Sequence, residues 1–149
     1  MGFTGQPRQK FLNKFDLKYN MSKKSRGTDA ERDLIRKFWS EGWPAMRAAG
    51  SGSMQYPSPD ILTGKNGRRL AIECKLTSSK KKYFPISEIN ELNYFAKHFG
   101  AEVWLAIKFP KHQWVFFTPE DLESTGKSFA ASLELAELKG LSFEELIDL

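Results

Sequence analysis

Two acidic residues and a lysine occupy defined positions around a predicted tight turn in residues 59–75. Asp60 precedes the turn, while Glu73 and Lys75 follow it, separated by one residue. At the centre, Asn66–Gly67 lies between two runs of aliphatic residues, which is a strong signal for a two-residue hairpin turn. The residues that could do chemistry are therefore expected on two adjacent antiparallel strands.

The predicted hairpin determines which side chains face one another. With the turn at its centre, Ile61 pairs with Ile72, and Asp60 lies opposite Glu73. Because side chains alternate along a strand, Lys75 projects from the same face as Glu73. Two facing carboxylates repel unless a cation lies between them, and oxygen ligands without Cys or His suit a hard ion such as Mg²⁺. The spacing therefore indicates an acidic patch with an adjacent lysine.

Length and composition indicate one soluble domain. The 149 residues are enough for a hydrophobic core, and 40% of them are hydrophobic. We expect no membrane span, because no apolar run approaches roughly 20 residues, and no secretory signal segment is recognisable. The single cysteine, Cys74, excludes an internal disulfide and favours a reducing, cytoplasmic location. It should point away from Glu73 and act as a small buried apolar residue.

Positive charge is concentrated in the first part of the chain, although the net charge is only +5. Residues 1–26 carry seven Lys or Arg and one Asp. Residues 27–116 carry fourteen basic and nine acidic groups, and residues 117–149 carry two basic and eight acidic groups. We predict a basic N-terminal arm over residues 1–26, which could follow a phosphate backbone, and a single domain over residues 27–149. Positive charge around an acidic patch favours a polyanionic substrate.

Helical periodicity predicts the first helix of the domain over Thr28–Gly42. Thr28 and Glu31 match a capping box, so the residue pattern alone favours Glu31 as a helix cap. A strand is expected over residues 43–49. The glycine- and serine-rich residues 50–58 predict a flexible loop that leads into the hairpin. This loop would bring hydroxyl groups within reach of a substrate at the acidic patch.

The residue pattern in the second half of the chain predicts the remaining helices and strands of an α/β domain. Residues 77–82 are expected to form a polar loop suited to a phosphate backbone, through Lys80, Lys81 and Lys82. The later elements are a helix over residues 85–99, strands over 102–109 and 114–118, partial helix over 129–138 and a short helix opened by Ser142. The order is therefore helix, strand, hairpin, helix, strand and strand.

The spacing Pro-Asp followed by Glu-x-Lys, together with this element order, resembles the PD-(D/E)XK nuclease superfamily. A closer resemblance is to the archaeal-type Holliday junction resolvases, and it covers about residues 22–149. It is carried by short segments, namely Arg26–Arg32, Arg47–Ser53, Pro59–Ile61, Ile72–Lys75, Phe95–Gly100 and Gly140–Leu146. The combination is far more specific than any one of these motifs.

This resemblance implies a fold, an activity and a cofactor. The implied fold is a PD-(D/E)XK restriction-endonuclease-like α/β core, with a mixed central β-sheet of about five strands flanked by helices. The family cuts four-way DNA junctions as a homodimer that depends on Mg²⁺, with Mn²⁺ as a possible substitute. By position, the metal ligands would be Glu31, Asp60 and Glu73, and Lys75 would act at the scissile phosphate.

The resemblance also implies residues that contact DNA. Arg32 and Arg47 match basic residues that are important in the family, and Ser51 matches a mobile-loop serine that would contact DNA and assist catalysis. Glu88 departs from the family, because members often have glutamine at this position. A fourth carboxylate there could bind metal or lie in solvent. By analogy with recombination nucleases, a sliding clamp or a recombination helicase is a further partner to consider.

Two other functions also fit the sequence. The chain could be a PD-(D/E)XK nuclease that acts on flaps, ends or foreign DNA, or a DNA-binding module without catalysis. The three acids together with Lys75 argue against the second reading, because binding alone does not require acids amid a basic surface. Cleavage of four-way, flap and linear DNA in Mg²⁺ and in EDTA would distinguish these functions.

Overall fold

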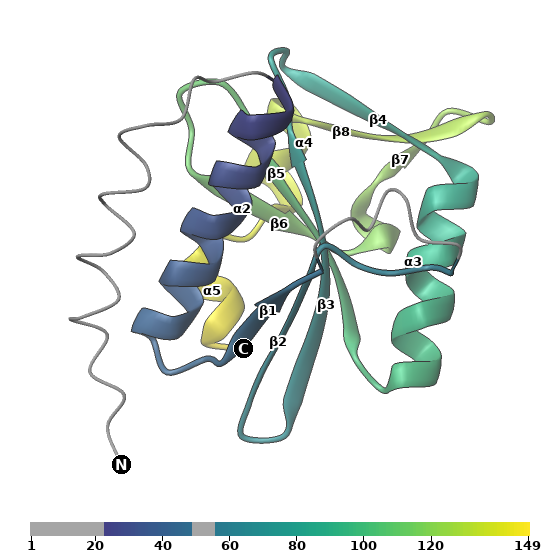
Figure 1. Ribbon diagram of the computed structural model, residues 1–149. Coiled ribbons are helices and arrows are strands. Elements are labelled where there is room, and N and C mark those ends of the chain that lie inside the picture. The colour runs from purple at the N-terminus through teal and green to yellow at the C-terminus, as the bar shows by residue number, and fades with distance from the viewer. Residues whose placement is uncertain (1–22, 49–55) are drawn as a thin grey trace.

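A mixed central sheet organises the structure, a computed structural model that describes residues 23–48 and 56–149 (Figure 1). Pairing in this sheet is antiparallel except between the third and fourth strands in spatial order, which are parallel. The predicted mixed sheet of five strands is therefore confirmed. Within the described residues its order is β1 (Ala45–Arg47), β2 (Ile61–Lys65), β3 (Arg68–Leu76), β5 (Glu102–Lys108) and β6 (Trp114–Phe117).

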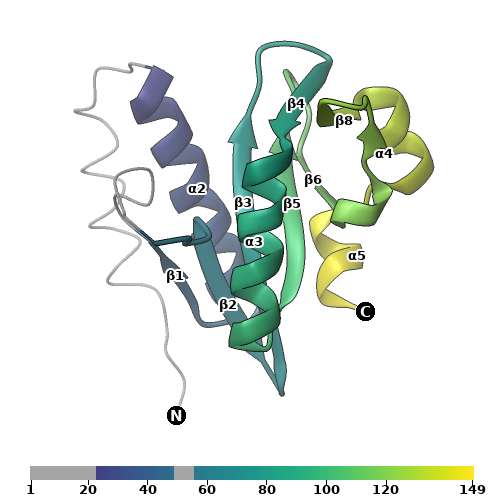
Figure 2. The ribbon, with the colours of Figure 1, turned by 90° about the vertical axis from the view of Figure 1, so that its right-hand side faces the viewer.

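Other elements cover both faces of the central sheet (Figures 1 and 2). One face packs against α2 (Lys23–Ser40) and α5 (Phe143–Ile147). The opposite face packs against α3 (Ile86–Phe99), α4 (Leu133–Lys139) and a second sheet. The second sheet has the order β4 (Lys81–Pro85), β8 (Ser128–Ser132) and β7 (Glu123–Ser124), and the 3₁₀ turn η2 (Pro119–Asp121) precedes β7. No helix in the described part of the chain is long and apolar enough to cross a membrane.

The hairpin of β2 and β3 forms with the predicted register. Ile61 pairs with Ile72, so Asp60 and Glu73 occupy the next facing positions. The turn residues Asn66–Gly67 have φ angles of 50° and 85°, the left-handed geometry that a two-residue hairpin turn requires. Glycine and asparagine adopt this geometry more readily than other residues. Local turn chemistry therefore specifies the alignment of the two acidic positions.

Strand β3 divides its side chains between the two faces of the sheet. Leu70, Ile72 and Cys74 belong to the apolar cluster on the α2 side. Because side chains alternate, Glu73 and Lys75 project toward the α3 side. Cys74 is buried and packs as a small apolar residue, as predicted. The alternation that builds the core therefore also gathers the polar side chains on one face.

Helix α2 begins earlier than the sequence predicts. It starts at Lys23, so Thr28 lies inside the helix and does not cap it, and the predicted capping box is wrong. The residues before Thr28 lack apolar periodicity, but Lys and Arg are good helix formers and extend the helix. The helix consequently crosses the predicted boundary between residues 26 and 27. Glu31 is left to make other contacts.

The sequence does not predict the second sheet. Residues 129–138, expected to be partly helical, divide between β8 and α4, and the helix begins only at Leu133. Lys81 and Lys82, expected in a loop, belong to β4, which pairs antiparallel with β8. The loop expectation is therefore wrong for Lys81 and Lys82, whereas partial helix within residues 129–138 is confirmed from Leu133 onward. The β8 segment is rich in small residues with weak strand propensity, and it becomes a strand only by pairing with a segment distant in the chain.

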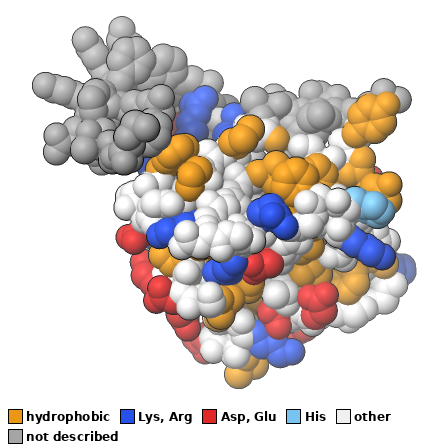
Figure 3. Space-filling view, turned by 90° about the horizontal axis from the view of Figure 1, so that it is seen from below, with side chains coloured by type: hydrophobic (Ala, Val, Ile, Leu, Met, Phe, Trp, Pro, Cys, Tyr) orange, Lys and Arg blue, Asp and Glu red, His pale blue; other side chains and the backbone are white. Residues whose placement is uncertain are grey.

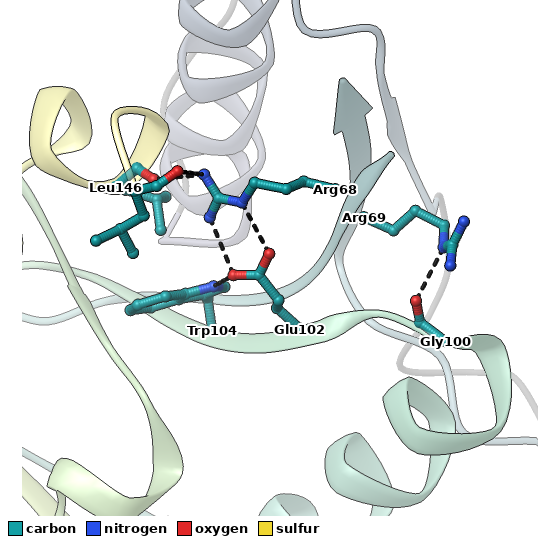
Figure 4. Close-up of polar contacts among 7 residues, drawn as sticks. Arg68, Arg69, Gly100, Glu102, Trp104 and Leu146 are labelled. Carbon is teal, nitrogen blue, oxygen red and sulfur yellow. Dashed lines mark hydrogen bonds and ion pairs between the residues drawn. The ribbon is translucent and has the colours of Figure 1, made fainter. Parts of the chain in front are cut away.

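An ion-pair network joins the hairpin to the C-terminal helix (Figure 4). At the start of β3, Arg68 donates to both carboxylate oxygens of Glu102, at 2.8 and 3.0 Å. The same guanidinium donates to the carbonyl of Leu146 at 3.0 Å, and Trp104 Nε1 donates to Glu102 Oε1 at 3.1 Å. The hydrogen bond from Arg68 lowers the pKa of Glu102. The network therefore holds the starts of the two parallel strands against α5.

Arg69 ties the same end of the sheet to α3. Its Nε donates to the carbonyl of Gly100 at 2.9 Å (Figure 4). Gly100 ends α3 with a φ angle of 82°, the left-handed geometry that glycine adopts readily at the end of a helix. The two neighbouring arginines therefore hold elements that lie on opposite faces of the sheet.

We predict that Glu102→Gln destabilises the fold at neutral pH by about 1 kcal/mol, the scale of a well-oriented but partly exposed ion pair. Because the folded pKa of Glu102 lies below the usual 4.5, this stabilisation is present above pH 4.5 and is lost as the pH falls through the folded pKa. Urea midpoints of the wild type and the variant should converge in acid. Glu91→Gln, at an exposed position of α3, is the matched control. Midpoints that stay equally separated in acid would contradict this role.

Candidate active site

A backbone hydrogen bond fixes Asp60 beside β3. Asp60 Oδ2 accepts from the Cys74 N–H at 2.8 Å, and the residue is only 9% exposed. The carbonyl of Asp60 accepts from the N–H of Ala48, just after β1, at 2.9 Å. This bond holds the Asp60 carboxylate against β3, where it contacts Glu73.

Asp60, which is buried, and Glu73, which is half-buried, form a pair of carboxyl groups in contact. Burial, and then the charge and hydrogen bond of Asp60, raise the pKa of Glu73 to about 9, although Lys75 partly opposes the increase. Without a bound cation, Glu73 therefore carries a proton near neutral pH. Two carboxyl groups in contact form an oxygen donor set whose repulsion a hard divalent cation would relieve.

Lys75 lies between two acidic side chains. Its Nζ is 2.6 Å from Glu88 Oε1 and 3.7 Å from Glu73 Oε1. Burial acts to lower the pKa of Lys75, but the hydrogen bond and charge of Glu88, with the charges of Glu73 and Asp60, produce a net increase. The lysine is consequently a charged hydrogen-bond donor within the site.

Glu31 approaches the site from α2 and pairs with Arg47. Arg47 Nε donates to Glu31 Oε2 at 2.8 Å, and Arg47 Nη2 donates to Thr28 Oγ1 at 3.4 Å. Burial raises the pKa of Glu31, the hydrogen bond from Arg47 opposes this increase, and the charge of Asp60 adds to it. Glu31 therefore lies within electrostatic range of Asp60, at the edge of the same acidic cluster.

The three predicted metal ligands are close but do not form a finished cage. Across residues 23–48 and 56–149, no three His, Cys, Asp or Glu side chains are gathered as a ready-made metal cluster. Asp60 and Glu73 are in contact, whereas Glu31 is drawn toward Arg47. A cation bound by all three acids would require Glu31 to share or leave its arginine. The structure thus brings Asp60, Glu73 and Lys75 together as predicted, with Glu31 beside them.

One family match covers most of the chain. The sequence model of the family described as archaeal Holliday junction resolvase (Hjc) matches residues 22–149. The chain belongs to the archaeal Holliday junction resolvase family. The crossover junction endodeoxyribonuclease Hjc of Archaeoglobus fulgidus is 41% identical over 129 residues, which cover 82% of this chain and 95% of that protein. The protein of the same name from Methanocaldococcus jannaschii is 32% identical, over 82% of this chain and 86% of its own length.

A solved structure from the Holliday junction resolvase family has the same fold. It is the 1.6 Å structure of Archaeoglobus fulgidus Hjc, a Holliday junction resolvase from an archaeal hyperthermophile. The two structures align with a TM-score of 0.76 at 38% identity, over 83% of this chain and 97% of the other. The restriction-endonuclease-like α/β fold predicted from the resemblance is therefore confirmed.

The two arginines that match basic residues of the resolvase family lie in different settings. Arg47 pairs with Glu31 and so belongs to the acidic site. Arg32 Nη1 lies 3.7 Å from Asp29 in the same helix, and its side chain is 40% exposed. Both predicted DNA contacts stay predictions, as does the contact from Ser51, which lies outside the described residues.

The three predicted DNA-binding lysines do not share one loop. Lys80 is exposed in the turn before β4, whereas Lys81 and Lys82 are successive residues of that strand and point to opposite sides. Lys81 Nζ lies 5.3 Å from the centroid of the Tyr83 ring, and Lys82 is half-buried. This positive charge therefore lies largely on the second sheet.

Glu88 makes a contact that sequence reasoning does not predict. The sequence leaves it as either a fourth metal ligand or a solvent residue, and the structure instead pairs it with Lys75. The available signal is its position in the first turn of a helix that packs on the side of β3 carrying Lys75. Thr28, expected to cap a helix, likewise contacts Arg47.

We predict that Glu73→Gln stabilises the metal-free protein. Because the pKa of Glu73 is raised on folding, the folded state holds a proton that the unfolded chain releases, and wild-type stability falls as the pH rises from 4.5 toward 9. Glutamine removes the acid and keeps its shape. The variant should gain roughly 5 °C in Tm in mildly alkaline buffer and lose the pH dependence.

The measurement is thermal unfolding in EDTA across this pH range. Glu144→Gln, at an exposed position of α5, removes one negative charge away from the pair and should leave the pH dependence unchanged. A Glu73→Gln protein that melts below the wild type at every pH would show that the carboxyl pair does not strain the fold.

Proposed function

We propose that the protein is a structure-selective, metal-dependent endodeoxyribonuclease that resolves four-way DNA junctions by paired hydrolysis of phosphodiester bonds. The similar proteins of Archaeoglobus fulgidus and Methanocaldococcus jannaschii are named crossover junction endodeoxyribonucleases. The observation that carries the proposal is the carboxyl pair of buried Asp60 and half-buried Glu73 with the Lys75 ammonium beside it. This arrangement offers cation ligands and a positive donor at one point, as attack on a phosphate diester requires.

The proposed cofactor is Mg²⁺, with Mn²⁺ as a substitute. Asp60 and Glu73 would hold the ion, and Glu31 would join them directly or through water. Oxygen-only donors fit a hard divalent ion. The raised pKa of Glu73 reflects its burial and then the charge of Asp60, a repulsion that such an ion would relieve. When bound, the ion supplies positive charge at the phosphate and makes water more acidic.

The residues of the chain have separable roles in this reaction. The Cys74 amide holds the Asp60 carboxylate in one orientation, so the ligand pair is organised before substrate arrives. Lys75 would donate to the phosphate oxygens, where negative charge develops. Its ammonium group already donates to Glu88 at 2.6 Å and lies 3.7 Å from Glu73 Oε1, so we assign Lys75 to charge stabilisation rather than to proton abstraction.

Arg47 and Arg32 would contact the DNA backbone without reading bases. Arg47 has a second consequence, because it now pairs with Glu31. A DNA phosphate that binds Arg47 would compete for the same donors and release the Glu31 carboxylate toward Asp60. Substrate binding would then complete the ligand set of the cation.

The charge distribution also fits a polyanionic substrate. Residues 117–149 carry eight acidic and only two basic groups. Figure 3 shows acidic side chains gathered along one edge of the face seen from below. An uneven charge distribution along the chain would orient the protein as it approaches DNA. The acidic edge would face away from the junction.

A homodimer is the proposed assembly. A four-way junction has approximate two-fold symmetry, so two subunits related by a C2 axis would place one site on each of two opposed strands. Binding to a sliding clamp or to a recombination helicase stays a prediction from analogy.

We predict that the protein cuts a four-way junction in Mg²⁺ and leaves it intact in EDTA, because the carboxyl pair lacks its cation in EDTA. Flap and linear DNA of the same sequence should be cut much more slowly. The measurement is separation of end-labelled strands on denaturing gels. Similar cutting of all three substrates would favour a nuclease with another target, and binding without cutting would favour a non-catalytic module.

The matched variants for this assay are Glu73→Gln and Glu144→Gln. Glu73→Gln should abolish cleavage yet bind the junction within a few-fold of the wild type, because the lost charge serves the cation and not the DNA. Glu144→Gln should cut like the wild type. Normal turnover by Glu73→Gln would remove Glu73 from the mechanism.

We predict that mixed dimers of wild-type and Glu73→Gln subunits nick junctions instead of cutting two strands, because each subunit would serve one strand. The substrate is a supercoiled plasmid with an extruded cruciform, on which one cut gives a nicked circle and paired cuts give a linear molecule. The mass of the protein from sedimentation provides the dimer control. Linear product from mixed dimers at the wild-type yield would rule out one site per subunit.

A further inference from the structure

The shortest ion-pair contact of Lys75 is with Glu88. Lys75 Nζ lies 2.6 Å from Glu88 Oε1, compared with 3.7 Å from Glu73 Oε1. The shorter distance is that of a strong, charge-assisted hydrogen bond. The direction of the lysine side chain is therefore set by Glu88 more than by Glu73.

Packing of α3 fixes the position of Glu88. The residue lies in the first turn of this helix, where the helix dipole favours a carboxylate. The next apolar positions, Ile89 and Leu92, are 2% and 5% exposed and belong to the core on the same side of the sheet. Pro85 ends β4 and directly precedes the helix. Glu88 is thus an acceptor on a rigid element rather than on a loop.

The ion pair of Lys75 and Glu88 is partly buried from solvent but remains accessible to a substrate. The side chains of Lys75 and Glu88 are 28% and 27% exposed. Partial burial strengthens an ion pair relative to one in open solvent. The remaining exposure leaves room for a phosphate oxygen to approach the ammonium group while Glu88 stays bound.

We propose that Glu88 is a positioning residue, which holds the Lys75 ammonium beside Glu73 so that the lysine is oriented for the scissile phosphate before DNA binds. This proposal rests on the nuclease function proposed above and adds a residue to it. A lysine side chain is long and flexible, so it loses conformational entropy when it is ordered in the reacting complex. If Glu88 already holds it in one geometry, less of this entropy remains to be lost during the reaction. The effect should therefore appear in the rate of the chemical step and not in DNA affinity.

The test compares Glu88→Ala, Glu88→Gln and the control Glu91→Ala in single-turnover cleavage of a four-way junction at saturating protein. Glu91 is exposed on the same helix. Glu88→Ala should cleave roughly tenfold to hundredfold more slowly, the scale of a misplaced catalytic group. Glu88→Gln should recover most of the rate, because its amide oxygen accepts the same hydrogen bond. Glu91→Ala should match the wild type.

Three parallel measurements separate positioning from other roles. Junction affinity in Ca²⁺ and the Mg²⁺ concentration for half-maximal rate should be unchanged in Glu88→Ala, and its Tm should fall by no more than the loss of one partly exposed ion pair, so that the protein stays folded in the assay. A wild-type rate for Glu88→Ala would overturn the proposal. A higher Mg²⁺ requirement in both Glu88 variants would also overturn it, because Glu88 would then be a metal ligand. A rate loss accompanied by an equal loss of folded protein would overturn it in favour of a structural role.

The wild type provides the remaining distinction. If wild-type protein cuts the junction and Glu88→Ala cuts equally well, only the positioning role fails. If the wild type cuts no junction in Mg²⁺, the nuclease function itself fails, and the role of Glu88 fails with it.

Discussion

The hydrogen bond from the Cys74 amide to the Asp60 carboxylate is the contact on which the site depends. It joins the residue before β2 to the middle of the polar stretch of β3, and it brings Asp60 against Glu73. The side chain of Cys74 meanwhile packs in the apolar cluster on the other face. One residue therefore contributes its backbone to the site and its side chain to the core. Close packing of that core therefore holds the residues of the acidic site in place.

This arrangement makes the two ends of the hairpin unequal. Near the turn, Arg68 and Arg69 hold β3 to α5 and to the end of α3 through well-formed hydrogen bonds. At the other end, two carboxyl groups lie against each other, and burial, followed by the charge of Asp60, raises the pKa of Glu73. The stabilising contacts are thus separated from the place where like charges meet. Functional sites commonly oppose stability in this way while the surrounding fold compensates.

The sequence predicts contacts between residues that are near one another in the chain better than contacts between distant segments. Asn66–Gly67 determines a local register, so the facing of Asp60 and Glu73 follows from residues near them. Pairing of β4 with β8 depends on a distant segment, and the local sequence gives no signal for it. The residue pattern alone favours Glu31 as a helix cap, and only the family resemblance indicates a role in the site. The contact between Lys75 and Glu88 needs the packing of α3, which no spacing rule provides.

The connectivity of the sheet has a consequence for how the protein folds. Two residues join β2 to β3, whereas the chain passes through β4 and α3 between β3 and β5. Hairpins close within roughly 1–10 μs, and pairing across a long crossover is slower. We therefore expect Asp60 and Glu73 to meet early on the folding pathway. We expect α3 to dock later and only then to bring Glu88 to Lys75. The contact between Asp60 and Glu73 would therefore form before the ion pair between Lys75 and Glu88.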